Sequence, residues 1–463
     1  HDENFHYPLA KGEMLVVPET IHTCSNNGFT ELSQRYHRCI REHICRGKYS
    51  RQTRPILLNS WEAAYFDFNG ETILKLAESA AELGIDMVVM DDGWFGKRDD
   101  DNSGLGDWQV NEEKLGCTLG DLIRGVNEAG VKFGIWIEPE MVSENSDLYR
   151  EHPDWAMRIP GRKPVRGRNQ LMLDFSRTDV RKLIFEHICD ILDQGNIEYV
   201  KWDMNRSIAE VYSAVNCPGR VTYDYVLGVY DFLEKLMQRY PDLLIEGCSG
   251  GGGRFDAGML YYTPQIWCSD NTDAVDRLRI QYGTSFFYPV SSVGSHVSAS
   301  PNHQTGRSTS LHTRGVVAMA GTFGYELATK ELTEEEKEEI KEQIVQYRKY
   351  GELIQNGNYY RLSNPFQDAC AAWMFGAKDQ KTVLLNVVLL ENHGNMTITY
   401  VKLKGLMPDA LYEDVETGKY YTGSALMEGG LPMPAEKKEY PAYQKEFRMV
   451  NGKDRVQACE SIV

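Results

Sequence analysis

Basic residues are under-represented in this sequence of 463 residues, which has 50 Lys and Arg against 67 Asp and Glu and a formal charge of −17. Nucleic acids and anionic membrane surfaces carry negative charge themselves, so a chain with this balance is not expected to bind either of them. No apolar run approaches the roughly 18 residues that a membrane-spanning helix needs. The sequence therefore predicts no nucleic-acid partner and no membrane partner, and it favours a neutral small molecule as the ligand.

Paired cysteine motifs are also missing, because the ten cysteines are scattered along the chain and form neither a CxxC pair nor a dense cluster. Scattered cysteines are typical of proteins from a reducing compartment. We therefore expect a cytoplasmic protein.

The sequence offers no metal site with a recognised spacing. His296, His303 and His312 lie seven and nine residues apart, outside the common zinc spacings, and we expect them to be loop histidines. Residues 99–104 resemble the first half of a calcium-binding loop, but Val110 stands where the bidentate Glu is required. We predict no metal. The glycine-rich run 249–254 lacks the Gly-Lys-Ser/Thr ending of a phosphate-binding loop, so we interpret it as a close backbone approach to a neutral ligand.

Short apolar strands alternate with helices over most of the chain after residue 51. Continuous apolar strands separated by helices indicate parallel strands that are buried on both faces. The predicted strands are residues 56–61, 87–90, 132–137, 168–174, 199–203, 243–248, 266–270 and 291–297. About eight such units within roughly 300 residues favour an α/β fold of the (β/α)8 TIM-barrel type, whose active site lies at the carboxyl ends of the strands.

The pattern changes after Gly321. Thr333 and Glu336 form a capping box that opens an amphipathic helix through about residue 354. Beyond it, turn residues separate short strands, predicted at residues 371–375, 382–390, 396–401, 410–413 and 420–421. We therefore predict a connector over residues 1–50, a catalytic (β/α)8 barrel over residues 51–355 and a C-terminal antiparallel β-sandwich over residues 356–463.

The predicted strand that begins at Tyr199 ends abruptly in charged and amide side chains. Because side chains alternate along a strand, Lys201, Asp203 and Asn205 are expected to project to one side. Asp270 ends another strand of the same predicted barrel. Two carboxylates about 5 Å apart are what a retaining glycosidase needs, and we predict that Asp203 and Asp270 form this pair. The nearby positive charge of Lys201 would keep the Asp203 carboxylate ionised.

Other residues at the strand ends leave alternatives open. Asp273 is an alternative to Asp270, although an Asp at the start of a helix is most simply an N-cap. Asp91 and Asp92 are adjacent, so both face a ligand only if the strand ends there; otherwise one of them is a structural carboxylate. Four tryptophans are candidates either for stacking on a sugar or for the core, namely Trp61, Trp94, Trp136 and Trp267.

Five motifs, in this order along the chain, resemble the α-galactosidases of glycoside hydrolase family 36. They are WEAAYFDF at residues 61–68, DDGWFG at 91–96, WIEPEM at 136–141, KWDMNR at 201–206, and CSGGG at 248–252 followed by SDNTD at 269–273. The resemblance implies a retaining double displacement on terminal α-galactosides such as melibiose and raffinose, with no cofactor. It implies that Asp203 is the nucleophile and Asp270 the acid/base. The implied sugar-binding residues are Asp91, Asp92, Trp136, Arg168, Lys201, Asn205, Cys248 and Gly250.

The resemblance also raises expectations about the whole protein. Members of the family carry a large N-terminal β-sandwich domain that helps to complete the pocket and a tetramer. This chain begins with His1 inside a polar segment, and we expect it to be without that domain, either through cleavage or as part of a longer protein. We expect a homo-oligomer, a tetramer by resemblance, that binds small galactosides. Alternative functions are a galactosyltransferase of the raffinose-synthase type, an α-N-acetylgalactosaminidase, or a galactoside-binding protein without catalysis.

Overall fold

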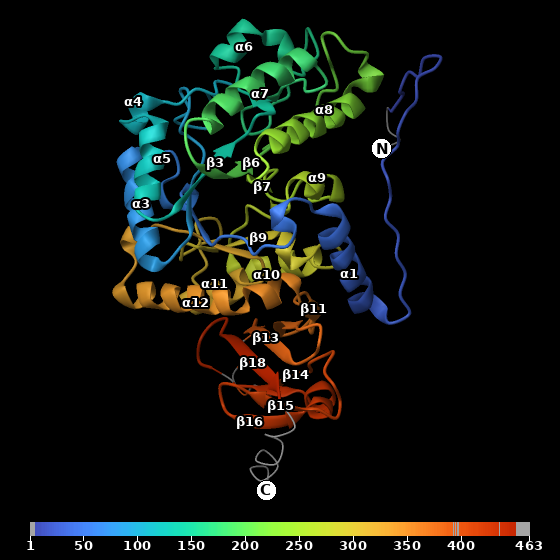
Figure 1. The fold of residues 1–463 in the computed structure, drawn as a ribbon, viewed down its shortest axis with the longest axis vertical. Helices are drawn as coiled ribbons and strands as arrows, with labels where there is room; N and C mark the ends of the chain where they lie inside the picture. The colour runs from blue at the N-terminus through green and yellow to red at the C-terminus, as the bar shows by residue number, and fades with distance from the viewer. Residues whose placement is uncertain (1–4, 392, 394, 396–397, 435, 451–463) are drawn as a thin grey trace.

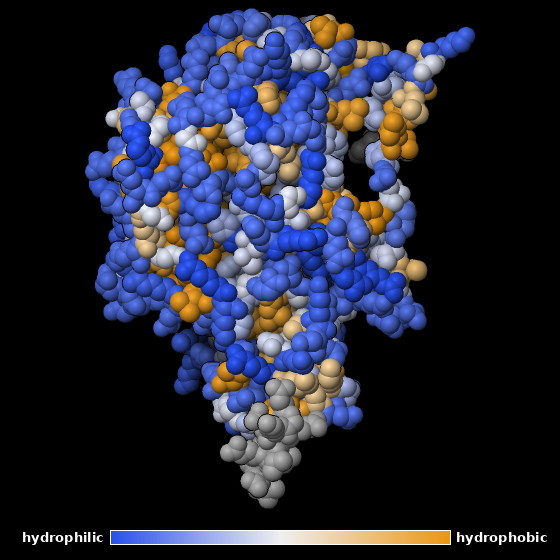
Figure 2. All heavy atoms as spheres, in the orientation of Figure 1, coloured by the Kyte–Doolittle hydropathy of each residue, from blue (hydrophilic) through white to orange (hydrophobic). Residues whose placement is uncertain are grey.

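A computed structural model of the chain describes residues 5–391, 393, 395, 398–434 and 436–450. It consists of a closed barrel surrounded by helices and a C-terminal sheet domain, which Figure 1 shows below helices α11 and α12. In this part of the chain, every helix is too short or too polar to cross a membrane. Hydrophilic residues cover most of the face seen in Figure 2, and hydrophobic residues appear there in scattered groups.

Eight parallel strands close the barrel, which confirms the predicted (β/α)8 fold. In the order of the chain they are β1 (Leu57–Asn59), β2 (Met87–Met90), β3 (Lys132–Ile137), β6 (Ile197–Trp202), β7 (Leu244–Gly247), β8 (Gln265–Trp267), β9 (Val293–Ser298) and β10 (Thr322–Glu326). Each strand pairs with its neighbour in this order, and β10 pairs with β1 to complete the ring.

Most of the longer helices around the barrel begin at a residue whose side chain caps the N-terminus. The longer helices are α3 (Gly70–Leu83), α5 (Leu119–Glu128), α7 (Thr178–Leu192), α8 (Pro218–Arg239), α10 (Ala274–Thr284), α11 (Leu311–Ala318) and α12 (Glu334–Asn356), with shorter helices α2 (Trp61–Ala64), α4 (Glu112–Leu115), α6 (Asp147–Glu151) and α9 (Ala257–Tyr262) between them. The predicted capping box of Thr333 and Glu336 opens α12. Asp273 accepts hydrogen bonds from the backbone N–H groups of Val275 and Asp276, so it is the N-cap of α10, as predicted.

One predicted barrel strand was assigned wrongly, and one strand of the barrel was not predicted. Residues 168–174 are not in the barrel: β5 (Leu171–Met172) pairs antiparallel with β4 (Met141–Val142) in a separate two-stranded sheet. The eighth barrel strand is β10, which the sequence analysis missed. Residues 171–173 are apolar because they are buried outside the ring, whereas the sequence of β10 contains only two large apolar residues among its five. Asp203 therefore follows the fourth barrel strand rather than the fifth, and Asp270 follows the sixth rather than the seventh.

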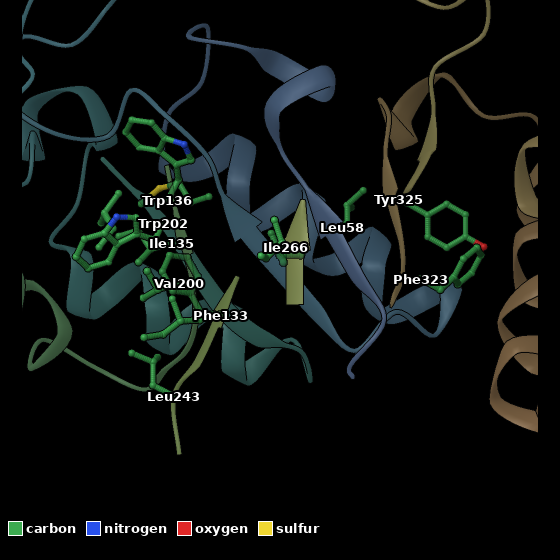
Figure 3. Packing of buried hydrophobic residues seen from close by; sticks show 14 of the residues in the cluster. Leu58, Phe133, Ile135, Trp136, Val200, Trp202, Leu243, Ile266, Phe323 and Tyr325 are labelled. Carbon is green, nitrogen blue, oxygen red and sulfur yellow. The ribbon is translucent and has the colours of Figure 1, made fainter. Parts of the chain in front are cut away.

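Side chains of β6 alternate between the interior of the barrel and the layer under the helices. Tyr199 belongs to a cluster of buried residues with Met87 of β2 and Leu244 of β7. Val200 and Trp202 point the other way, and Figure 3 shows them beside residues of β3. The Trp202 ring lies 5.2 Å from the ring of Phe232 in α8. This alternation directs the odd-numbered residues of β6, ending at Asp203, toward the axis of the barrel.

The C-terminal domain is an antiparallel sheet domain, as predicted. Its main sheet has the order β11 (Asn358–Arg361), β12 (Cys370–Gly376), β13 (Thr382–Leu389), β18 (Ala442–Met449), β15 (Leu411–Asp414) and β16 (Lys419–Thr422), and β14 (Thr399–Val401) pairs with β17 (Leu431–Met433). The predicted strand 396–401 begins at Met396, which lies outside the described residues. β11, β17 and β18 were not predicted. Met374, Tyr412 and Phe447 lie in the core of this domain.

The N-terminal segment lies along the outside of the barrel. Residues 5–27 run in extended form beside α8, where the hydroxyl of Tyr223 donates a hydrogen bond to the carbonyl of Val16 and the Tyr7 ring lies 5.4 Å from the Tyr223 ring (Figure 1). The helix α1 (Gly28–Cys39) follows and packs against β11. The segment thus contacts both the barrel and the C-terminal domain.

Candidate active site

A cavity of about 270 Å³ lies at the carboxyl ends of the barrel strands. Its lining residues come from seven of the eight barrel strands or the loops that follow them, and from the loop that contains Arg168. They are Trp61, Glu62, Tyr65, Asp91, Asp92, Trp136, Arg168, Lys201, Asp203, Asn205, Trp267, Asp270, Thr272, His303, Gln304 and Glu326. The cavity therefore contains both predicted catalytic aspartates and six of the eight predicted sugar-binding residues.

The Asp203 carboxylate accepts hydrogen bonds on both of its oxygens. Oδ1 accepts from the backbone N–H groups of Met204 (2.8 Å) and Gly250 (3.2 Å), and Oδ2 accepts from Nδ2 of Asn205 (2.8 Å) and Nε1 of Trp136 (3.2 Å). Burial acts to raise the pKa of Asp203, but the positive charge of Lys201 and the hydrogen-bond donors outweigh it and hold this pKa below its ordinary value. Asp203 is therefore ionised at neutral pH.

The other aspartate of the pair, Asp270, has the opposite tendency. Its Oδ1 accepts a hydrogen bond of 3.0 Å from Nε1 of Trp267. Burial raises the pKa of Asp270, and the negative charge of Asp203 raises it further. The pKa of one carboxyl group of the cavity is thus lowered and that of its neighbour is raised. This is the division that a nucleophile and an acid require.

Lys201 forms a buried ion pair with Asp91 at the bottom of the site. Its Nζ donates to Oδ2 of Asp91 at 2.9 Å, and Nδ2 of Asn59 donates to the same oxygen at 2.8 Å. Burial opposes the charged form of Lys201, but the charges of Asp91 and Glu326 outweigh it and raise the pKa of Lys201 well above its ordinary value. The lysine therefore stays charged and ready to donate to a ligand.

We expect Lys201→Met to lower the free energy of unfolding by about 3–5 kcal/mol, because it leaves the Asp91 carboxylate buried without its cation. Urea unfolding of the variant measures this change. The double variant Lys201→Met/Asp91→Asn removes both charges and is expected to recover most of the loss. Equal stability of the wild-type protein and the single variant would contradict the assignment of a buried pair.

The two adjacent carboxylates, Asp91 and Asp92, both line the cavity because β2 ends at Met90. Asp92 also pairs with the guanidinium of Arg98, whose Nη2 lies 2.8 Å from Oδ2. Burial raises the pKa of Asp92 to about 6, against the opposing charge of Arg98. Asp91 and Asp92 thus have different cationic partners on the same side of the cavity.

Arg168 belongs to a strained loop. Arg168 has a φ of 46° and Asn169 a φ of 60°. These are left-handed backbone conformations, which are uncommon in residues other than glycine. Nη1 of Arg168 donates to Oδ1 of Asn205 at 2.5 Å. The loop therefore places Arg168 beside the residue that holds Asp203.

Cys248 and Gly250 lie behind the Asp203 carboxylate rather than in the lining of the cavity. The thiol of Cys248 is buried and donates to Asp203, which helps to hold the pKa of Asp203 low. Gly250 has a φ of 53°, a left-handed conformation that suits glycine, and its N–H points to Asp203. The sequence predicted that the backbone of the glycine-rich run closely approaches a neutral ligand. In the structure, the backbone of this run closely approaches the carboxylate of Asp203.

The predicted sugar-stacking tryptophans divide into two groups. Trp61, Trp136 and Trp267 line the cavity. Trp94 is fully buried, and its Nε1 donates to the backbone carbonyl of Trp136 at 2.9 Å. Trp94 therefore supports the wall that Trp136 forms and does not contribute to the lining.

Sequence reasoning missed two carboxyl groups of the cavity, Glu62 and Glu326. Burial raises the pKa of each to about 7. Glu326 ends the strand that was not predicted, whereas Glu62 stands directly after the first strand and had the same signal as the residues that were selected. Oε1 of Glu62 accepts a hydrogen bond of 2.6 Å from the hydroxyl of Thr272.

The expectation of loop histidines was wrong for two of the three residues. His296 lies in β9, where its ring is buried and Nδ1 is 3.0 Å from Oε2 of Glu326. His312 lies in α11. His303 is in a loop and lines the cavity. Within the described ranges, His, Cys, Asp and Glu side chains form no group of three or more that could hold a metal ion.

Two family models match the chain. The model described as melibiase matches residues 15–357, and the model described as the glycosyl hydrolase family 36 C-terminal domain matches residues 370–447. The chain is similar to the bifunctional alpha-galactosidase/sucrose kinase AgaSK of Mediterraneibacter gnavus, with 64% identity over 447 residues. It is also similar to the alpha-galactosidase AgaA of Geobacillus stearothermophilus, with 49% identity over 440 residues.

The alignments cover nearly all of this chain and a smaller share of its relatives. They include 96% of the chain and 47% of AgaSK, and 94% of the chain and 60% of AgaA. The chain therefore spans about half the length of the curated relatives it matches. A crystal structure of an AgaA variant in complex with raffinose aligns with a TM-score of 0.90 and 48% identity, covering 91% of this chain and 59% of that chain.

Proposed function

We propose, on the premise that this chain belongs to glycoside hydrolase family 36, that it hydrolyses terminal non-reducing α-galactosides through a covalent galactosyl-enzyme intermediate. The observation that carries the proposal is the pair of aspartates in one cavity, of which Asp203 has a lowered pKa and Asp270 a raised pKa. The similarity to AgaA, which has been crystallised with raffinose, supports raffinose-type oligosaccharides as substrates.

The proposed reaction begins with an attack by a carboxylate oxygen of Asp203 on the anomeric carbon. The bond from that carbon to the leaving oxygen breaks, and Asp270 transfers its proton to this oxygen. The products are a β-linked galactosyl ester of Asp203 and the released alcohol. The charge of Asp203 is now consumed in the ester bond, so the pKa of Asp270 falls and its carboxylate can act as a base.

The second step regenerates the protein. Asp270 removes a proton from a water molecule, whose oxygen attacks the anomeric carbon from the opposite face. The ester bond breaks, Asp203 regains its negative charge, and galactose leaves with the α configuration. The ion pair of Lys201 and Asp91, together with Asp92, supplies hydrogen-bonding groups for the sugar hydroxyls.

The proposed function is tested with an aryl α-galactoside and with raffinose. We expect release of the aryl alcohol and of galactose, and we expect α-galactose as the first product when the reaction is followed by NMR. The aryl β-galactoside and the aryl α-N-acetylgalactosaminide serve as controls that should react far more slowly. Transfer of galactose to sugar acceptors in preference to water would favour the galactosyltransferase alternative. Absence of cleavage would contradict the proposal.

The pH dependence of kcat/KM is expected to be bell-shaped. As the pH falls through the lowered pKa of Asp203, the nucleophile becomes protonated and activity is lost. As the pH rises through the raised pKa of Asp270, the acid loses its proton and activity is lost again. The window of activity therefore lies between these two pKa values. Initial rates across the pH range check this expectation, and circular dichroism at each pH separates titration from unfolding.

A further inference from the structure

The sequence Glu138-Pro139-Glu140 contains two glutamates with the same burial and very different partners. Both side chains are 0% exposed. Oxygen atoms of Glu140 accept from two nitrogens of Arg254 (2.8 and 3.0 Å), from Nε1 of Trp202 (2.8 Å) and from the hydroxyl of Tyr225 (2.5 Å). Donors thus surround the Glu140 carboxylate, and a cation balances its charge.

Glu138 has neither a paired cation nor a full set of donors. Its Oε1 accepts from Nε2 of Gln170 at 2.7 Å and from the backbone N–H of Asn205, while its Oε2 is buried without a hydrogen-bond partner among the described residues. A buried carboxylate with one unsatisfied oxygen is costly, and the cost grows when another carboxylate is close. The geometry of Glu138 therefore suits a neutral carboxylic acid.

The negative groups that face Glu138 favour the same state, and the positive charge of Arg98 acts against it. Asp203 at the end of β6 and Asp92 after β2 are negative neighbours, and Arg98 in the same loop as Asp92 forms its close contacts with Asp92. Burial raises the pKa of Glu138 to about 8, and the charge of Asp203 contributes to this rise. At neutral pH, Glu138 thus stays protonated beside an ionised Asp203.

The two residues that donate hydrogen bonds to Glu138 belong to the two chain segments that carry Arg168 and Asp203. Gln170 closes the strained loop of Arg168, and Asn205 donates to Oδ2 of Asp203. Arg206 holds the same segments together, because its Nη1 donates to the carbonyls of Val165 (2.6 Å) and Gln170 (2.9 Å). Residues with a left-handed backbone conformation persist only where the surrounding structure holds them. Here Glu138 and Arg206 hold the loop that contains Arg168 and Asn169.

We propose that Glu138 is a positioning residue that acts as a neutral acid and sets, through Gln170 and Asn205, the places of Arg168 and of the Asp203 carboxylate. It touches neither the substrate nor the reacting atoms, since it does not line the cavity. The proposal deepens the proposed function and rests on it for its kinetic readouts.

Substitution by glutamine distinguishes a neutral acid from a carboxylate, because glutamine has the shape of a protonated glutamate and keeps the accepting Oε1. We expect Glu138→Ala to lower kcat about 10–100-fold and to raise KM, because the nucleophile and Arg168 are both displaced. Glu138→Gln is expected to rescue both constants to within about threefold of the wild-type values. Gln170→Ala frees only the Arg168 loop, so it is expected to raise KM more than it lowers kcat.

Glu140→Gln is the matched control, since Glu140 is equally buried but pairs with Arg254. It is expected to lower the thermal unfolding midpoint by about 5–10 °C, whereas Glu138→Gln should shift it by less than about 2 °C. The inference is overturned if kcat and KM of Glu138→Gln are as impaired as those of Glu138→Ala, or if Glu138→Ala keeps the wild-type kcat. A wild-type protein that cleaves no α-galactoside would refute the proposed function, while the two unfolding shifts still decide whether Glu138 is neutral.

Discussion

Asp203→Ala is expected to lower kcat for an aryl α-galactoside by a factor on the order of 10⁴ to 10⁶, the range seen when a covalent nucleophile is removed from other enzymes. The physical reason is the loss of a cavity carboxylate that four N–H groups, two on each oxygen, and a nearby lysine hold in the ionised form. Steady-state kinetics with the purified variant measure the effect. Wild-type activity in the variant would refute the assignment of the nucleophile.

Azide provides a positive test of the same assignment. The space vacated by the Asp203 side chain admits a small anion, which attacks the anomeric carbon from the same side and restores turnover. The product should be β-galactosyl azide, because one displacement inverts the α configuration. Formation of the α anomer would contradict a nucleophilic role for Asp203. Circular dichroism and the unfolding midpoint verify that the variant is folded.

Asp270→Ala is expected to lower kcat/KM for raffinose about 10²–10⁴-fold, which is the usual contribution of a general acid or base. The loss should be much smaller for an aryl galactoside with a strongly acidic phenol, because its leaving oxygen needs little protonation. Rates for a series of phenols of different acidity check this expectation. A loss that is independent of the phenol would contradict the role of Asp270 as the acid.

With Asp270→Ala, azide is expected to give the opposite anomer. Here azide replaces water in the second step and attacks the β-linked intermediate, so the product is α-galactosyl azide. The matched control is Asp273→Asn, which changes the neighbouring aspartate but keeps an N-cap for α10. This control should retain the phenol dependence of the wild-type protein. If Asp273→Asn shows the steeper dependence on the phenol while Asp270→Ala keeps that of the wild-type protein, the two aspartates have been assigned the wrong way round.

Local patterns were sufficient to predict most of the barrel and both catalytic candidates. Alternation along β6 placed Lys201, Asp203 and Asn205 on one side, and all three line the cavity. The end of β2 at Met90 allows Asp91 and Asp92 to face the same space. These inferences succeeded because they depend only on the period of a strand and on where the strand stops.

Hydrophobicity alone could not show which segments belong to the barrel, because an apolar segment can be buried outside the ring and a barrel strand can contain few large apolar residues. Residues 171–173 are as apolar as a barrel strand but are buried under the loops outside the ring. β10 is part of the ring, yet Gly324 occupies its middle because a Cβ there would lie 2.7 Å from Cδ2 of His296. Glu326 was missed together with its strand. Close packing between neighbouring strands, rather than local hydrophobicity, decides both cases.

The sequence by itself determined the barrel, the C-terminal sheet domain and the residue types at the strand ends, since these follow from periodicity, turns and caps over a few residues. The ionised state of Asp203 was expected from the neighbouring Lys201, but only the tertiary structure decided the charge states of the other buried carboxyl groups. Glu138 and Glu140 stand two residues apart in the same motif, but Arg254, 114 residues away from Glu140, pairs with one, and Asp203 lies beside the other. Protonation depends on distances to groups that are remote in the sequence and on burial, and neither exists before the chain has folded.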